Sequence, residues 1–336
     1  MTSAFRSPIL RPLRHALSAR AATVLLASAL VGQSPLVTTY ASNNGGAVGG
    51  QVFFDLNVLS LTGITIKSLD VNLSAASVAG TINLLTVAAA SYTAGLNSTT
   101  AASWTGPGGT GTVVAQGLDK PSHVCFPGGV FLPFGVHGVA IQYVGVAARY
   151  TNGPALPLPP VAMPGTWELT LSYGAAQNVP FVGLFTPRIW NGAIHYDVGA
   201  TTPCATCADK VAYGAPCASP CAPFPLLTVD ANYPVLGEPL EIVTTGASPC
   251  AVLGFTMIGF APTIPTAVLL PPFTCFQHVA PAVHWMSTVT AGSWNSTLAL
   301  PNGGSLCGMQ LFVQSATFEV PWSVVTSNGL QLILGS

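Results

Sequence analysis

The chain has 336 residues, of which 50% are apolar and only 6% are charged. This composition excludes an intrinsically disordered chain, which combines low hydrophobicity with high net charge. It also argues against a helical protein, because exposed helix faces are normally built from Glu, Lys and Arg.

Residues 1–41 are predicted to form a secretory signal peptide. Arg6, Arg11, Arg14 and Arg20 supply a positive segment, and the uncharged apolar run 21–31 follows it. Small-residue cleavage sites are present at 39–41 and, as an alternative, near position 32. The apolar run is too short to span a bilayer comfortably, so a membrane anchor is the weaker interpretation. The general export route is favoured because no adjacent Arg pair precedes the run.

Removal of that segment leaves a mildly acidic chain. Five of the nine basic residues remain (9 − 4) and face ten Asp and Glu, which gives a net charge of 5 − 10 = −5. No basic stripe is left to neutralise phosphates, so nucleic acid is not an expected partner. No later segment is a convincing membrane span, because the apolar runs are interrupted by proline.

Short runs of alternating apolar and polar residues, separated by Gly and Pro, follow the signal peptide and predict β-strands. In the first half the predicted strands are Gln51–Asn57, Ile64–Leu73, Ala79–Val87, Thr110–Gln116, Gly138–Val146, Thr166–Tyr173, Val179–Phe185 and Gly192–Val198. In the second half they are Pro225–Asp230, Pro239–Thr245, Cys250–Gly259, Thr266–Leu270, Ser296–Leu300, Leu306–Val313, Trp322–Val325 and Leu330–Leu334. This spacing predicts an all-β fold of two β-sandwich modules, jelly-roll or immunoglobulin-like, at 42–200 and 224–336.

The predicted strand Ile64–Leu73 contains a break in its alternation. Its apolar positions are 64 and 66 before the break and 69, 71 and 73 after it. A one-residue slip in a period-two pattern predicts a β-bulge near Lys67 and Ser68.

A cysteine-rich junction at 201–223 separates the two predicted modules. It holds half of the eight cysteines, and an even number of cysteines in an exported chain favours disulfides. Its C-x2-C-x9-C-x3-C spacing also allows a four-thiolate zinc site as an alternative. The disulfide candidates are Cys125, Cys204, Cys207, Cys217, Cys221, Cys250, Cys275 and Cys307.

Both halves carry segments that resemble modules of exported bacterial proteins. The first half contains VFFDLNVLSLTGITIKSLDVNL, then YTNG at 150–153 and PRIWNGAIHY at 187–196, and resembles a β-sandwich module of bacterial exoproteins. The second half contains YGAPC at 213–217 and SNGLQLILG at 327–335, and is similar to a C-terminal β domain of secreted proteins from large-genome bacteria. Pro216 stands where that domain usually has a glycine. The resemblance implies export and carries no catalytic residues over.

The segment PRIWNGAIHYD offers a candidate ligand site. Arg188, Trp190, Asn191 and Tyr196 combine an aromatic face with planar polar groups, which is the chemistry that sugar-binding sites use. Trp104 lies in a long glycine-rich loop and is a further candidate. The alternative interpretation is structural, with Trp190 packed in the core and Asn191 in a tight turn.

The sequence supports no cofactor or metal site. His195 shares a strand face with Asp197, but two ligands do not make a site. The pairs Asp55 with Asn57 and Asp70 with Asn72 could join a calcium site only with loop oxygens that the sequence does not identify.

The sequence therefore predicts a secreted or cell-surface protein without catalytic activity. A structural or adhesive role is favoured, with extracellular glycans or a surface matrix as partners. The alternative is a hydrolase of extracellular polysaccharide, which would need titratable groups placed together in a chain that is poor in them.

Overall fold

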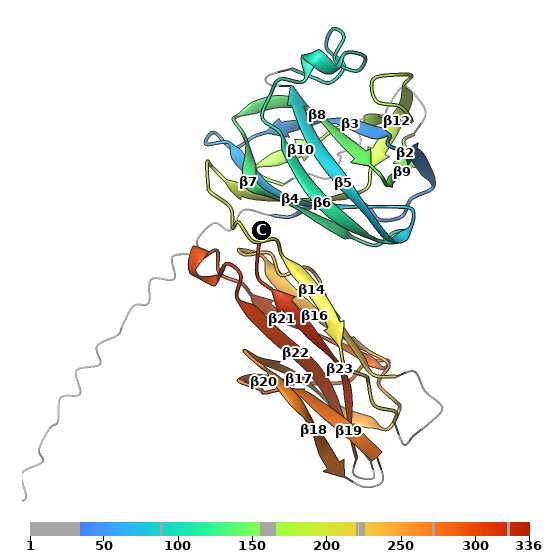
Figure 1. Cartoon of the computed structure of the whole chain (residues 1–336), viewed down its shortest axis with the longest axis vertical. Helices are drawn as coiled ribbons and strands as arrows, with labels where there is room; N and C mark the ends of the chain where they lie inside the picture. The colour runs from blue at the N-terminus through green and yellow to red at the C-terminus, as the bar shows by residue number, and fades with distance from the viewer. Residues whose placement is uncertain are drawn as a thin grey trace, which may run out of the picture. The chain divides into compact units, whose positions relative to one another are not determined.

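The computed structural model describes residues 34–87, 90–154, 166–219, 221, 226–270, 273–320 and 323–336. Over these residues the chain is built from antiparallel strands and contains no α-helix, only the two 3-10 turns η1 (Ala101–Ser103) and η2 (Gly304–Leu306) (Figure 1). The predicted all-β class is confirmed. No helix within the described ranges has the length and hydropathy needed to cross a membrane. Residues 1–33 of the predicted signal peptide lie outside these ranges, as do the predicted strand starts Pro225 and Trp322.

The strands of residues 34–200, here called the N-terminal half, form two sheets. The four-stranded sheet has the order β1 (Leu36–Val37), β13 (Gly192–Val198), β4 (Ile64–Val71), β7 (Ser122–Leu132). The nine-stranded sheet has the order β2 (Asn44–Val48), β9 (Ala147–Asn152), β12 (Phe185–Trp190), β11 (Gly174–Gln177), β3 (Gln51–Val58), β8 (Gly135–Val144), β5 (Ala76–Val87), β6 (Gly109–Gln116), with β10 (Leu169–Leu171) paired to β3.

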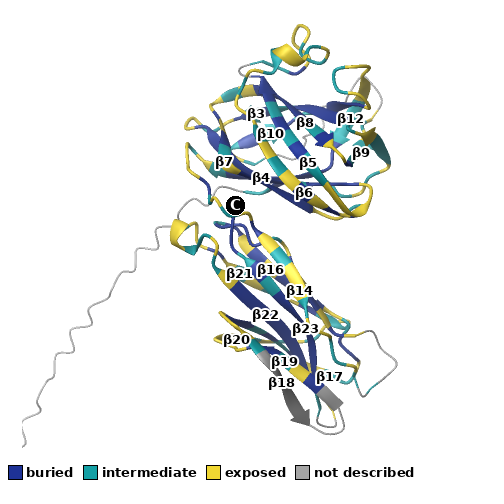
Figure 2. Ribbon diagram, in the orientation of Figure 1, coloured by how far each residue is buried: buried dark blue, intermediate teal, exposed yellow. Residues whose placement is uncertain are grey.

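One hydrophobic core draws on residues of both sheets in this half. The inward positions of β4 and β3 alternate with outward ones, as the period of two requires, and supply Ile64, Ile66, Phe54 and Leu56. Trp190 is fully buried in the same core. Figure 2 shows buried residues along strands of this half such as β3 and β8. Burial of this many branched and aromatic side chains is the main stabilisation available to a chain with so few charges.

Residues 201–336, the C-terminal half, form three smaller sheets. The five-stranded sheet has the order β14 (Asp209–Tyr213), β23 (Ser323–Ile333), β22 (Gln310–Glu319), β17 (Ala251–Gly259), β20 (Val283–Ser287). The three-stranded sheet is β15 (Thr228–Ala231), β16 (Pro239–Thr245), β21 (Ser293–Ala299), and the pair is β18 (Pro262–Leu270) with β19 (Phe273–Val279). A separate core lies between strands of this half, including Leu240, Ile242, Val313 and Leu332.

The predicted bulge in β4 is present and falls on Lys67. The ladder of β4 with β7 pairs Ile66 with Val130 and then Ser68 with Cys125, which skips Lys67. The ladder with β13 skips the same residue between its Tyr196 and His195 pairs. Lys67 is therefore the extra residue of the bulge, and a bulge redirects the side chain that it carries.

All eight cysteines are paired, which confirms the expected disulfides. The four bonds are Cys125–Cys207, Cys204–Cys307, Cys217–Cys275 and Cys221–Cys250. Every cysteine of the predicted junction bonds to one outside it, so a four-thiolate zinc site is excluded. Cys207 forms its disulfide with Cys125 in β7 of the N-terminal half. Cys204, three residues earlier, forms its disulfide with Cys307 of the C-terminal half. Four disulfides are typical of proteins that fold in an oxidising compartment.

Candidate functional site

A group of charged side chains lies on the face of the four-stranded sheet that points away from the core. In β13 Ile194 and Tyr196 belong to the core, so His195 and Asp197 project from the opposite face. His123 of β7 lies directly across the ladder from Asp70 of β4, which projects from the same face. Strand alternation alone therefore collects two histidines and two aspartates on one surface.

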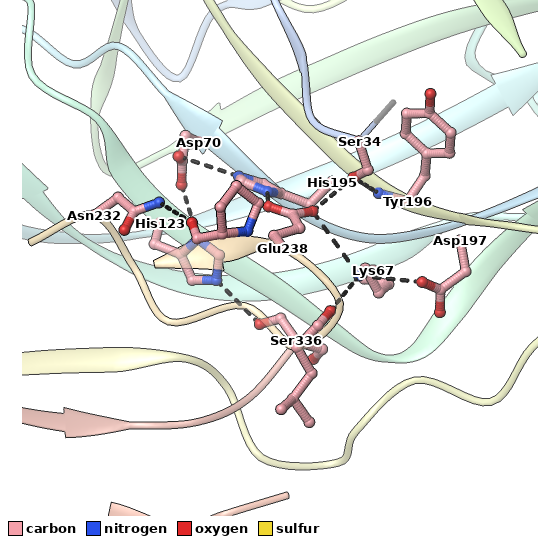
Figure 3. Close-up of polar contacts among 12 residues, drawn as sticks. Ser34, Lys67, Asp70, His123, His195, Tyr196, Asp197, Asn232, Glu238 and Ser336 are labelled. Atoms are coloured by element: carbon pink, nitrogen blue, oxygen red, sulfur yellow. Dashed lines mark hydrogen bonds and ion pairs between the residues drawn. The ribbon is translucent and has the colours of Figure 1, made fainter. Parts of the chain in front are cut away.

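The C-terminal half covers this surface and adds a further carboxylate. Glu238 is in the turn that precedes β16, and its side chain is almost fully buried. Lys67 also points here, because its position in the bulge directs its amine toward the backbone oxygen of Leu236 at 2.9 Å. These side chains form an interface cluster, drawn in Figure 3, whose members are Lys67, Asp70, His123, His195, Asp197 and Glu238.

His195 lies at the centre of the interface cluster, between two carboxylates. Its Nδ1 is 2.7 Å from Oε2 of Glu238, which crosses between the two halves. Its Nε2 is 3.1 Å from Oδ2 of Asp70, which is close enough for an ion pair. This contact does not have the geometry of a hydrogen bond. The other oxygen of Glu238 accepts a 2.6 Å hydrogen bond from Ser34.

His123 makes the second contact between the halves. Its Nδ1 is 2.7 Å from Oδ1 of Asp70, and its Nε2 is 3.0 Å from the backbone oxygen of Ser336. Tyr233 of the C-terminal half stacks on the imidazole, with ring centroids 4.6 Å apart.

Lys67 neutralises the remaining carboxylates. Its amine is 3.2 Å from Asp197 and 3.9 Å from Glu238. Asp197 also accepts hydrogen bonds from Asn302 of the C-terminal half and from Thr201. A buried lysine without such partners would pay a large desolvation cost, so these contacts explain how a cation is tolerated at this depth.

The electrostatics favour the charged forms of the central groups. Burial alone would lower the pKa of His195, but Glu238 and Asp70 outweigh it and raise that pKa to about 10. Burial raises the pKa of Asp70, yet the charge of His195 and the hydrogen bond from His123 lower it well below its usual range. The pKa of Glu238 is lowered in the same way, since His195 and Lys67 outweigh burial.

Access to the interface cluster is restricted. A cavity of about 50 Å³ next to Lys67 and Asp197 is large enough for a few water molecules but not for a sugar ring. A wider pocket of about 300 Å³ opens beside His123 and is lined also by Tyr233, Cys207 and Asp209. The carboxylates are held by partners within the chain.

One subset of the interface cluster has the donors of a metal site. Asp70, His123 and His195 each offer a ligand atom, and these three atoms lie within 4.8 Å of one another. Among the described residues no other group of three His, Cys, Asp or Glu side chains is brought together in this way. The predicted calcium pairs are not part of such a group, apart from Asp70 itself.

The residues predicted to bind a ligand do not converge on one surface. Trp190 and Tyr196 are in the core, where Trp190 stacks on Phe54 at 5.3 Å. Asn191 is buried and accepts a hydrogen bond from Thr151.

The two remaining candidates are partly buried in different places. The guanidinium of Arg188 lies over the ring of Tyr150 at 5.7 Å. Trp104 packs on Phe53 at 5.6 Å, on the outer face of the nine-stranded sheet. The burial of Trp190 agrees with the structural alternative, whereas no turn is present at Asn191, which links β12 to β13 in the other sheet.

Sequence reasoning missed Lys67, His123 and Glu238 as members of a site. A signal was available, because the interface cluster uses three of the ten acidic residues in a chain that has very few charges. Lys67 lies inside a predicted strand, where a charge in such a chain has few explanations other than pairing or function. His123 and Glu238 lie outside the predicted strands, so this signal does not extend to them.

Comparison with protein-family models and with curated proteins gives no match for the chain. The resemblance to modules of exported bacterial proteins therefore stays a prediction.

Proposed function

We propose that the chain is an exported, non-catalytic structural or adhesive protein in which the interface cluster joins two β modules. The observation that carries the proposal is that the densest group of titratable side chains is buried and its charges are paired within the chain. Catalytic groups must reach a substrate, whereas a joint needs partners on both sides and little solvent. The bond from His195 to Glu238 and the ion pair from Lys67 to Glu238 supply such partners.

The two modules are proposed to be β-sandwiches of the jelly-roll or immunoglobulin type. Support comes from the N-terminal core, which contains residues of both sheets, and from the separate core of the C-terminal half. The disulfide from Cys125 to Cys207 and the one from Cys204 to Cys307 would then fasten the junction to each module in turn.

Export predicts a specific mature N-terminus. Of the two sequence-based cleavage sites, the one near position 32 is favoured, because Leu36 is buried and pairs with Ile194 of β13. Cleavage after Ala41 would remove β1 and the hydrogen bond from Ser34 to Glu238. We expect the intact mass of the secreted protein to correspond to a first residue at or before Ser34. A first residue of Ser42 would contradict this expectation.

Adhesion is proposed to involve an exposed apolar rim of the N-terminal half. Trp167 is 82% exposed and Leu61 is 85% exposed, which is rare for side chains of this size. Their loops are adjacent, since the backbone nitrogens of Leu59 and Ser60 both bond to the oxygen of Glu168. An exposed indole with apolar neighbours suits stacking on the apolar face of a sugar ring.

Retention on insoluble polysaccharides tests both parts of the proposal. We expect the mature protein to be retained without release of soluble sugar, and Trp167→Ala to reduce retention at least about 10-fold, on the order of one lost stacking contact. Trp285→Ala, at a partly buried tryptophan of the C-terminal half, is the matched control. Release of soluble sugar would favour the hydrolase alternative. Retention of Trp167→Ala equal to that of wild type would exclude the apolar rim at Trp167 and Leu61 as the adhesive surface.

A further inference from the structure

The carboxylate of Asp70 stands between two imidazoles. One oxygen is 2.7 Å from Nδ1 of His123, and the other is 3.1 Å from Nε2 of His195. Two imidazole nitrogens with one carboxylate form a donor set that suits zinc. Zinc bonds of 2.0–2.1 Å in a tetrahedral site separate ligand atoms by about 3.3 Å. To admit an ion, the 2.7 Å contact has to lengthen, and the three ligand atoms, which lie within 4.8 Å of one another, have to adopt that spacing.

The far nitrogen of each imidazole has the partner that metal-bound histidines normally have. Nδ1 of His195 contacts the Glu238 carboxylate at 2.7 Å, and Nε2 of His123 contacts the backbone oxygen of Ser336 at 3.0 Å. Such contacts fix the ring orientation and direct the remaining nitrogen toward the metal. Here both remaining nitrogens face Asp70 (Figure 3).

A second observation points to a missing ligand. Nε2 of His195 is buried, the residue is only 5% exposed, and this atom has no hydrogen-bond partner. Its ion-pair contact with Asp70 at 3.1 Å is not a hydrogen bond, and a buried polar atom without a hydrogen bond is uncommon in native proteins and calls for an explanation such as an ion. A metal bound between Asp70 and His195 would satisfy this nitrogen.

The charge balance of the interface cluster agrees with a divalent cation. Asp70, Asp197 and Glu238 contribute −3 and Lys67 contributes +1. These four groups sum to −3 + 1 = −2, and an ion of charge +2 brings the sum to zero. Charges that are taken out of water are tolerated when they are balanced locally.

We propose that Asp70, His123 and His195 bind one zinc ion at the contact between the two halves. Binding would require His195 to be neutral, so its ring proton is released to solvent and the ion takes over its charge. The pocket of about 300 Å³ beside His123 offers a route for the ion. The proposal is independent of the adhesive role, since it concerns the joint and not the rim at Trp167.

Zinc titration of the untagged, exported protein tests the proposal. After removal of metal with a chelator, we expect one zinc per chain to remain bound through gel filtration. A zinc concentration of 100 times Kd should raise the unfolding temperature by about 5 °C. X-ray absorption at the zinc edge should report two imidazoles with oxygen ligands and no sulfur, and this measurement needs no variant.

Variants assign the site to the three residues. We expect His123→Ala and Asp70→Asn to weaken zinc binding on the order of 100-fold or more, because each removes a direct ligand. His284→Gln is the matched control, since His284 is exposed on β20 and remote from the interface cluster in the chain. Circular dichroism establishes that each variant is folded.

Three results would overturn the proposal. The first is the absence of stoichiometric zinc from wild-type protein, and the second is unchanged binding in both cluster variants. The third is loss of zinc in His284→Gln, which would place the ion elsewhere.

Discussion

Trp190→Ala is expected to lower the free energy of unfolding by about 3–5 kcal/mol, as truncations of large aromatic side chains in cores do. The side chain is fully buried and stacks on Phe54. Its indole nitrogen donates a 3.1 Å hydrogen bond to the hydroxyl of Tyr143, which is itself buried. Truncation therefore creates a cavity and also leaves the Tyr143 hydroxyl without its donor, and the two costs act in the same direction.

Denaturant unfolding followed by circular dichroism measures this loss. Trp167→Ala is the matched control, because the side chain is 82% exposed and its removal should change stability by no more than about 0.5 kcal/mol. Trp190→Phe should lie between wild type and Trp190→Ala, since it keeps an aromatic ring beside Phe54 but loses the hydrogen bond. A Trp190→Ala protein as stable as wild type would mean that the indole lies at the surface, as a sugar platform would.

Local alternation made the fold class predictable from the sequence. β13 and β16 match the predicted ranges residue for residue, because their apolar positions repeat every second residue without interruption. The slip in β4 was predicted for the same reason, since a bulge changes which positions of a strand are apolar.

Strands without clean alternation were missed. β7 was not predicted, and it contains Pro127, Gly128 and Gly129, which read as a turn rather than as a strand. Its pairing with β4 supplies the tertiary context that overrides this local preference. β9 and β12 were likewise absent from the prediction. The predicted strand Val179–Phe185 is wrong, because Val179 and Val182 close a tight turn and the strand β12 begins only at Phe185.

Disulfide pairing lies beyond what spacing can decide. The even number of cysteines was sufficient to predict bonds, yet each junction cysteine bonds to a partner 29 to 103 residues away. Which partner it takes depends on where separate sheets come together, and no local pattern encodes that.

The interface cluster could be predicted only in part. Alternation put His195 and Asp197 on one face of a strand, but an outward polar face is normally read as solvated. Here the C-terminal half covers that face, and Glu238 reaches His195 from 43 residues further along the chain. Long-range coverage of this kind leaves no periodic signal, although the scarcity of charges in the chain could have directed attention to those that remain.

Glu238→Gln is expected to lower the free energy of unfolding by about 3–5 kcal/mol in metal-free buffer, because it breaks a buried ion pair and leaves His195 with Asp70 and Lys67 with Asp197 as their remaining carboxylates. The substitution keeps the volume of the side chain but removes the carboxylate that faces His195, Lys67 and the hydroxyl of Ser34. Because Glu238 belongs to the C-terminal half and His195 to the N-terminal half, the loss should also separate one unfolding transition into two.

Calorimetry in the presence of a chelator measures both effects. Glu241→Gln is the matched control, since Glu241 is an exposed glutamate three residues further along, in β16, and should change stability by no more than about 0.5 kcal/mol. The double variant His195→Gln with Glu238→Gln should recover part of the loss, because the imidazolium that lost one of its two carboxylates is gone as well, and contacting residues show coupling of this kind. If Glu238→Gln were as stable as Glu241→Gln, the Glu238 carboxylate would not stabilise the contact between the halves. The interface cluster would then not be the joint that the proposed structural role requires.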